Sequence, residues 1–188
     1  MSNYPNAGDG LRKIYLAAIG SIVCSFITII PMIPMLQLVG AIGAIVCGVI
    51  TLIGFYQAGK DIEGCKAAFV LQIIALVINV LDSFTDMPVF LSVVAGIVPV
   101  VAISLMCWSV SNVLKDIGAD RIAKQGMVAM FTYIGCSVLT IVLEMCILII
   151  IAYDGLGLYL LLTLVIAIVE LFFYLRFLKN AAEQFGSY

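Results

Sequence analysis

The sequence predicts an all-α, polytopic membrane protein with six transmembrane helices. Hydrophobic residues make up 64% of the 188 residues and charged residues 11%, whereas soluble domains contain roughly 45–50% and about 25%. A soluble fold of this length could not bury so many apolar side chains, because much of its surface stays in contact with water. Short polar or proline-containing breaks divide the chain into apolar segments of membrane-spanning length.

An uncharged run from Ile14 to Ala58 is too long for a single span, since about 20 residues cross the hydrocarbon core. Pro31 and Pro34 lie near the middle of this run. Proline removes a backbone donor and disfavours helix in the residue before it. The run is therefore expected to form two helices joined by a tight turn. The polar, turn-rich residues 1–11 that precede it are predicted to be a disordered tail.

Charged or turn-forming residues separate the later helices. The longest such stretch is Asn112–Gly126, where Lys115 and Gly118 suit the end of a helix and Asp120 suits a cap of the next. The expected helices lie at about residues 12–31, 35–57, 67–84, 89–111, 127–153 and 158–177. They form one transmembrane domain over 12–178, which is followed by a short tail at 179–188.

The distribution of basic residues predicts the topology. Alternate non-membrane segments hold all nine lysines and arginines, while the other turns carry only Asp82, Asp86 and Asp154. Lysine and arginine are retained on the cytoplasmic side of membrane proteins. We therefore expect a multi-pass protein of the plasma or bacterial inner membrane, with both termini in the cytoplasm. Its three antiparallel hairpins would lie at about residues 12–57, 67–111 and 127–177.

The basic segments also resemble one another. When Lys60, Lys115 and Lys179 are aligned, a polar or charged residue stands three positions before each lysine, and Asp or Asn follows it. This regularity suggests that the three hairpins are repeats of one unit. The same matches can also arise because loops favour these residue types, so both interpretations stay open.

Two acidic residues, Glu144 and Glu170, lie inside predicted spans. Counted from Gly155 at 1.5 Å per residue, they lie about 16 and about 22 Å below the outer turn, near the middle of a core about 30 Å thick. A charged carboxylate there costs at least about 2.5 kcal/mol, so intramembrane acids are candidate functional residues. Because the last two helices form a hairpin, the two carboxyl groups are expected to be neighbours that share a proton. The alternative is that each is a protonated packing residue.

Other polar side chains share the faces of these helices. In each of the last two helices, a threonine lies four or seven residues from the acid and therefore on the same face. In the third helix, two amides seven residues apart also share a face. The further members of a candidate ion or proton site are therefore Thr140, Thr163, Gln72 and Asn79. The stripes that carry the acids also include Tyr133, Ser137, Tyr159 and Tyr174.

Enzymatic activity is not expected. The chain has no histidine, and so lacks the commonest metal ligand and the commonest general base. The sequence contains no G-x-S-x-G, Walker, H-E-x-x-H or G-x-G-x-x-G motif. No C-x-x-C pair occurs among the six cysteines. We therefore predict no catalytic residue, metal site or cofactor.

Two functional hypotheses follow from these observations. The first is a non-enzymatic accessory, sensor or assembly component of the membrane. The second is a small proton- or cation-coupled transporter or channel that uses Glu144 and Glu170. The expected partners are the lipid bilayer and either a second copy of the chain or another membrane protein, and no nucleic acid is expected.

Overall fold

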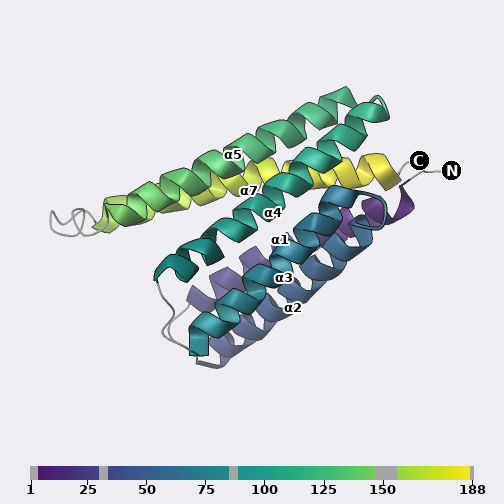
Figure 1. The fold of residues 1–188 in the computed structure, drawn as a ribbon. Helices are drawn as coiled ribbons and strands as arrows, with labels where there is room; N and C mark the ends of the chain where they lie inside the picture. Colours follow the sequence, from purple (N-terminus) through teal and green to yellow (C-terminus); the bar gives the residue numbers. More distant parts are fainter. Residues whose placement is uncertain (1–3, 30–33, 85–88, 147–155, 187–188) are drawn as a thin grey trace.

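The computed structural model describes residues 4–29, 34–84, 89–146 and 156–186. These residues form six helices (Figure 1), namely α1 (Pro5–Ile29), α2 (Pro34–Ala58), α3 (Glu63–Phe84), α4 (Val89–Asp116), α5 (Asp120–Met145) and α7 (Leu156–Gly186). Within the described residues, α1, α2, α4, α5 and α7 are long and apolar enough to cross a membrane. The prediction of an all-helical protein with membrane-spanning helices is thus confirmed.

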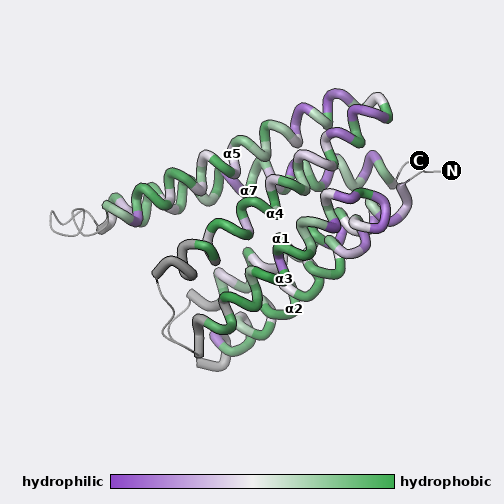
Figure 2. The backbone as a smooth tube through the Cα atoms, viewed as in Figure 1, coloured by the Kyte–Doolittle hydropathy of each residue, from purple (hydrophilic) through white to green (hydrophobic). Residues whose placement is uncertain are grey.

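The helices form a closed ring. Each helix packs against the next one along the chain, and α7 packs against α1. Both termini lie at the end of the bundle where α2 joins α3 and α4 joins α5 (Figure 1). Hydrophilic residues gather at this same end (Figure 2). We call it the terminal end, and it comprises residues 4–14, 55–68, 106–126 and 174–186.

The packed core lies mainly at the terminal end. Towards the other end, the described helices expose many large apolar side chains, such as Val142 and Met145 of α5 and Leu158 of α7. In water the hydrophobic effect drives apolar faces together, whereas lipid is as apolar as these side chains and supplies no such force. A core near the polar end therefore suits a bundle whose other part lies in lipid. The largest fully buried side chains include Leu11, Phe55, Met106, Leu114, Phe177 and Leu178.

The N-terminal segment corrects one expectation. The sequence predicts a disordered tail over residues 1–11, but α1 begins at Pro5. The Asp61 carboxylate accepts hydrogen bonds from the backbone N–H of Asn6 (2.7 Å) and of Ala7 (2.9 Å), and from the side-chain amide of Asn6 (2.9 Å). A carboxylate at a helix N-terminus satisfies unpaired N–H groups and complements the helix dipole. The cap comes from a distant loop, so local composition did not reveal it.

In the C-terminal segment, predicted as a short tail at 179–188, helix α7 continues to Gly186. The ring of Phe185, which is buried, lies 5.8 Å from the ring of Tyr4 between centroids. The two ends of the chain therefore dock on each other, and this contact extends both terminal helices beyond the apolar spans.

Gly118 ends α4 as the sequence predicts. Its φ of 80° lies in the left-handed region, which glycine adopts without a Cβ penalty. The N–H of Gly118 donates to the carbonyl of Lys115 at 3.0 Å, and the N–H of Ala119 donates to the carbonyl of Leu114 at 2.8 Å. This is the Schellman arrangement, and it satisfies two carbonyls that the helix end would leave unpaired.

The helices around this turn are longer than their apolar spans. Helix α4 ends at Asp116 rather than near residue 111, and α5 begins at Asp120 rather than near residue 127. Ala119, not Asp120, is the N-cap residue of α5, and it makes no side-chain capping bond. Charged residues such as Lys and Arg end a membrane span but remain good helix formers in water. Hydropathy therefore marked the hydrocarbon boundary and not the helix ends.

Several predicted turn residues lie beyond the described part of the chain. The end of the fifth helix near residue 153, together with Asp86 and Asp154, is outside the described residues. Asp82 belongs to α3, but its side chain is also outside the description.

A glycine near the start of α1, of α3 and of α5 makes a close contact with another helix. A Cβ added at any of these glycines would overlap atoms of that helix. The contacting residues are Gly10 with Gly54 and Ala58 of α2, Gly64 with Ser109 of α4, and Gly126 with Ser111 of α4 and Phe177 of α7. Gly54 and Ser109 correspond when Lys60 and Lys115 are aligned, because each lies six residues before its lysine.

Candidate functional site

The two intramembrane acids line one groove between α4, α5 and α7. Glu144 and Thr140 reach this groove from α5, and Glu170 reaches it from α7. The groove has a volume of about 430 Å³. We call it the carboxylate groove, and its other lining residues are Gly96, Ile97, Val100, Ser137 and Ile141.

Helical spacing explains how α5 lines the groove. Ser137, Thr140 and Glu144 are separated by three and four residues, which places their side chains on one helical face. On α4, Gly96 contributes no side chain, and a Cβ added there would meet no atom within 4 Å. The opening therefore lies between a polar face of α5 and a residue of α4 that has no side chain.

The two acids occupy different environments. Glu170 is half-buried, whereas Glu144 is exposed. Glu144 therefore has more contact with the surroundings of the bundle than Glu170 has.

The predicted threonines bond to their own helices. The Thr140 hydroxyl donates to the carbonyl of Cys136 at 3.0 Å, and the Thr163 hydroxyl donates to the carbonyl of Tyr159 at 2.9 Å. A hydroxyl that donates in this way keeps its oxygen lone pairs for a proton donor or a cation. Thr140 lines the carboxylate groove, but Thr163 is not among its lining residues. Thr140 is therefore the predicted threonine that the structure brings to the acids.

The predicted amides are not brought to the acids. Gln72 lines a separate groove of about 440 Å³ between α2, α3 and α4, together with Thr51 and Pro99. Asn79 belongs to α3, but its side chain lies outside the described residues. Periodicity identified the face that Gln72 shares, but it could not indicate which neighbouring helix that face meets.

Polar residues continue from the groove towards the terminal end. The rings of Tyr133 and Tyr174 lie 6.2 Å apart between centroids. Ser104 follows Ile97 by seven residues on α4 and so shares its face. The Ser104 hydroxyl oxygen is buried and has no hydrogen-bond partner in the described part of the chain. The polar stripes of the sequence included both tyrosines, whereas Ser104 gave no signal because serine is a common packing residue in membrane helices.

Comparison with known proteins finds no matching family model, curated protein or solved structure. The chemistry of the carboxylate groove must therefore carry the functional argument. Its lining residues are acidic, hydroxyl-bearing or apolar, and none is basic. Carboxylate and hydroxyl oxygens without a basic partner are complementary to a proton or a metal cation.

Proposed function

We propose that the chain crosses the plasma or bacterial inner membrane six times, as three hairpins with both termini in the cytoplasm. The charge distribution supports this orientation, because lysine and arginine are retained in the cytoplasm and all nine occur in alternate segments. The contacts of Gly10 with Gly54 and of Gly64 with Ser109, which correspond when Lys60 and Lys115 are aligned, support a repeat of the first two hairpins. In this proposal α3 is the sixth span.

The orientation predicts a labelling pattern. In Asp154→Cys, a membrane-impermeant maleimide should label intact cells, whereas in Ala119→Cys it should label only permeabilised cells. The unmodified chain is the control, because burial raises the pKa of the Cys65 thiol to about 12 and only thiolates react readily. The other five cysteines lie in the proposed spans. Labelling of Ala119→Cys, but not of Asp154→Cys, in intact cells would reverse the proposed orientation.

We propose that the carboxylate groove binds a proton or a small cation and that this binding is coupled to transport, without enzymatic activity. The observation that carries the proposal is that acids from two helices, Glu144 and Glu170, line one groove that lacks a basic residue. A charged carboxylate is costly in hydrocarbon, so binding a proton or a cation to it stabilises the occupied state. Thr140 supplies a further oxygen ligand from the same face of α5.

The two acids would act in sequence. Glu144, the more exposed acid, would be the first carboxylate that an entering proton or cation meets. Glu170, half-buried beside the pair Tyr133–Tyr174, would hold it next. In this proposal, release towards the terminal end passes the rings of Tyr133 and Tyr174, which lie in contact between α5 and α7. Glu170 is therefore expected to be the more important of the two acids.

Flux through proteoliposomes tests this function. With a pH-sensitive dye inside and a proton gradient imposed, or an indicator for Na⁺ or K⁺ and a gradient of that ion, Glu170→Gln should reduce flux by at least about tenfold, because glutamine keeps the shape but not the charge. Glu144→Gln should have a smaller effect. The matched control is Glu183→Gln on an exposed turn of α7, which should leave flux unchanged. Equal flux in the wild type and both groove variants would contradict the proposal.

A second candidate is a non-enzymatic accessory or assembly component. Its specific support is the exposure of Glu144 in a part of α5 that is expected near the bilayer centre. A carboxylate that faces lipid is unfavourable by at least about 2.5 kcal/mol, so a helix of a second copy or of another membrane protein would stabilise the assembly by covering it. This candidate differs from the first because it predicts that no flux will be measured under any imposed gradient.

A further inference from the structure

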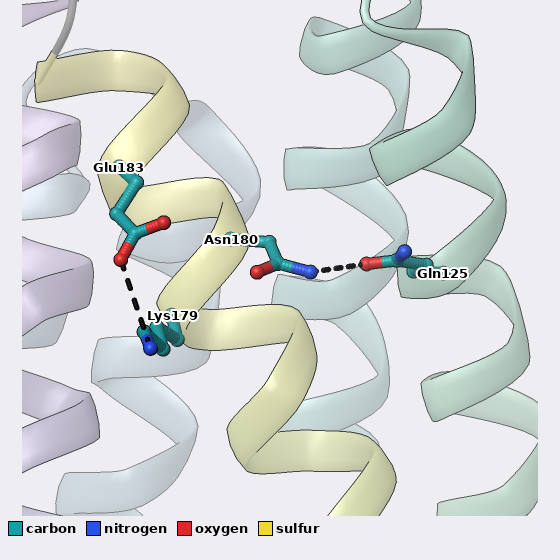
Figure 3. Close-up of polar contacts among 4 residues, drawn as sticks. All are labelled: Gln125, Lys179, Asn180 and Glu183. Atoms are coloured by element: carbon teal, nitrogen blue, oxygen red, sulfur yellow. Dashed lines mark hydrogen bonds and ion pairs between the residues drawn. The ribbon is translucent and has the colours of Figure 1, made fainter.

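A polar groove of about 500 Å³ lies between α5 and α7 at the terminal end. Arg121 and Gln125 line it from α5, and Arg176 and Asn180 line it from α7. Each pair is four residues apart and therefore shares a helical face. The Asn180 side-chain amide donates to the Gln125 carbonyl oxygen at 2.7 Å, which joins the two helices across the groove (Figure 3). We call it the arginine groove.

The charge available in the arginine groove is positive. Glu183 is its one acidic lining residue, and the Glu183 carboxylate pairs with Lys179 at 4.0 Å. Figure 3 shows this pair on the side of α7 that is turned away from the contact between Asn180 and Gln125. Within the described chain, neither arginine has a carboxylate within 4.0 Å. Both guanidinium groups are therefore available to an anion.

The two arginines lie on either side of the amide contact. Helices α5 and α7 run antiparallel here, because Gln125 meets Asn180 while the later Tyr133 meets the earlier Tyr174. Arg121 is thus one turn nearer the tip of the terminal end, and Arg176 is one turn nearer the apolar spans. Their Cα atoms are about 12 Å apart along the helix axes, a separation that two long side chains can bridge from both sides of one anion.

The depth of Arg176 indicates the source of this anion. Arg176 follows the start of α7 at Leu156 by 20 residues, which corresponds to about 30 Å of helix and to the thickness of a hydrocarbon core. It is also the first charged residue after Glu170, and the residues between them are apolar or aromatic. Its guanidinium therefore lies at the level of the phosphates of the adjacent leaflet.

We propose that the arginine groove binds the phosphate of an anionic glycerophospholipid from the cytoplasmic leaflet. Guanidinium groups donate paired, charge-assisted hydrogen bonds to phosphate oxygens, with a geometry that lysine cannot reproduce. The bond between Gln125 and Asn180 holds the two arginine-bearing helices at a fixed separation. The proposal rests on insertion of α7 in the bilayer, but it does not depend on transport through the carboxylate groove.

Lipid retention and thermal stability test the proposal. Detergent-solubilised protein is titrated with phosphatidylglycerol, with phosphatidylcholine, or with inorganic phosphate at millimolar concentration. A ligand that binds the folded state raises the midpoint of thermal unfolding, and native mass spectrometry counts the retained lipids on folded protein. We expect phosphatidylglycerol to raise the midpoint and to be retained, while phosphatidylcholine has no effect. Inorganic phosphate, which lacks the acyl chains, should stabilise far less.

The variant Arg121→Gln/Arg176→Gln should bind phosphatidylglycerol at least about tenfold more weakly. The matched control is Lys124→Gln, which removes one exposed charge of α5 that does not line the groove and should leave binding unchanged. Arg121→Lys/Arg176→Lys keeps the charge and the fold but loses the paired hydrogen bonds, so its binding should be intermediate. Equal retention by the wild type and both double variants overturns the proposal. If inorganic phosphate stabilises the protein as much as phosphatidylglycerol does, the proposal that the bound phosphate belongs to a lipid is overturned.

Discussion

Gly10→Val should destabilise the protein by roughly 3 kcal/mol, at the upper end of the effect of overpacking a close contact. A Cβ at Gly10 would lie 2.5 Å from the carbonyl oxygen of Gly54 and 2.6 Å from the backbone nitrogen of Ala58. Backbone atoms cannot rotate away as a side chain can, so α1 would have to move off α2. For a chain of this length the expected fall in the thermal midpoint is about 6–12 °C.

The matched control is Gly135→Val in α5. A Cβ at Gly135 would meet no atom within 4 Å, and valine is a slightly better helix former than glycine. The midpoint should therefore change by less than about 2 °C. A thiol-reactive dye measures both variants, because the fully buried Cys65 and Cys107 become accessible only on unfolding. Equal losses at positions 10 and 135 would contradict a specific contact between α1 and α2.

The sequence predicts the helices of this protein better than their ends. Apolar runs and Pro34 located the spans, because about 20 apolar residues cross a bilayer and proline interrupts a helix. The order of residues 5–11 instead depends on Asp61, which lies 55 residues from Asn6 in the chain. A capping contact of that kind is created by the packing of distant segments, so no local pattern encodes it.

The sequence indicated some of the residues that line the carboxylate groove and not others, for a similar reason. Glu144 and Glu170 were identified because acids are rare and unfavourable in hydrocarbon, and the helix pair α5–α7 brings both to one groove. Gln72 meets a different groove, because periodicity fixes a face on one helix but not the rotation of that helix against its neighbours. Arg121 and Arg176 were explained by topology alone. Their proposed role in lipid binding depends on the contact that aligns α5 with α7.

Phe177→Ala should cost about 3–5 kcal/mol, the usual loss for a fully buried phenylalanine. Phe177 is 0% exposed, and its ring lies against Gly126 of α5 so closely that a Cβ there would come within 2.5 Å of a ring carbon. The ring thus fills the space between α5 and α7. The control Phe172→Ala removes a side chain of the same size from the same helix, but that side chain is 57% exposed and its loss should be small.

The position of Phe177 adds a second expected result. It lies three residues after Tyr174 and three before Asn180, and so between the two polar contacts that join α7 to α5. Gly126→Ala should destabilise the wild type and have a smaller effect in Phe177→Ala, because the overlap with the ring is then absent and only the overlap with the Ser111 hydroxyl of α4 remains. Such coupling between the two substitutions is the signature of a direct contact. Additive losses would mean that Phe177 stabilises α7 without closing the space between these two helices.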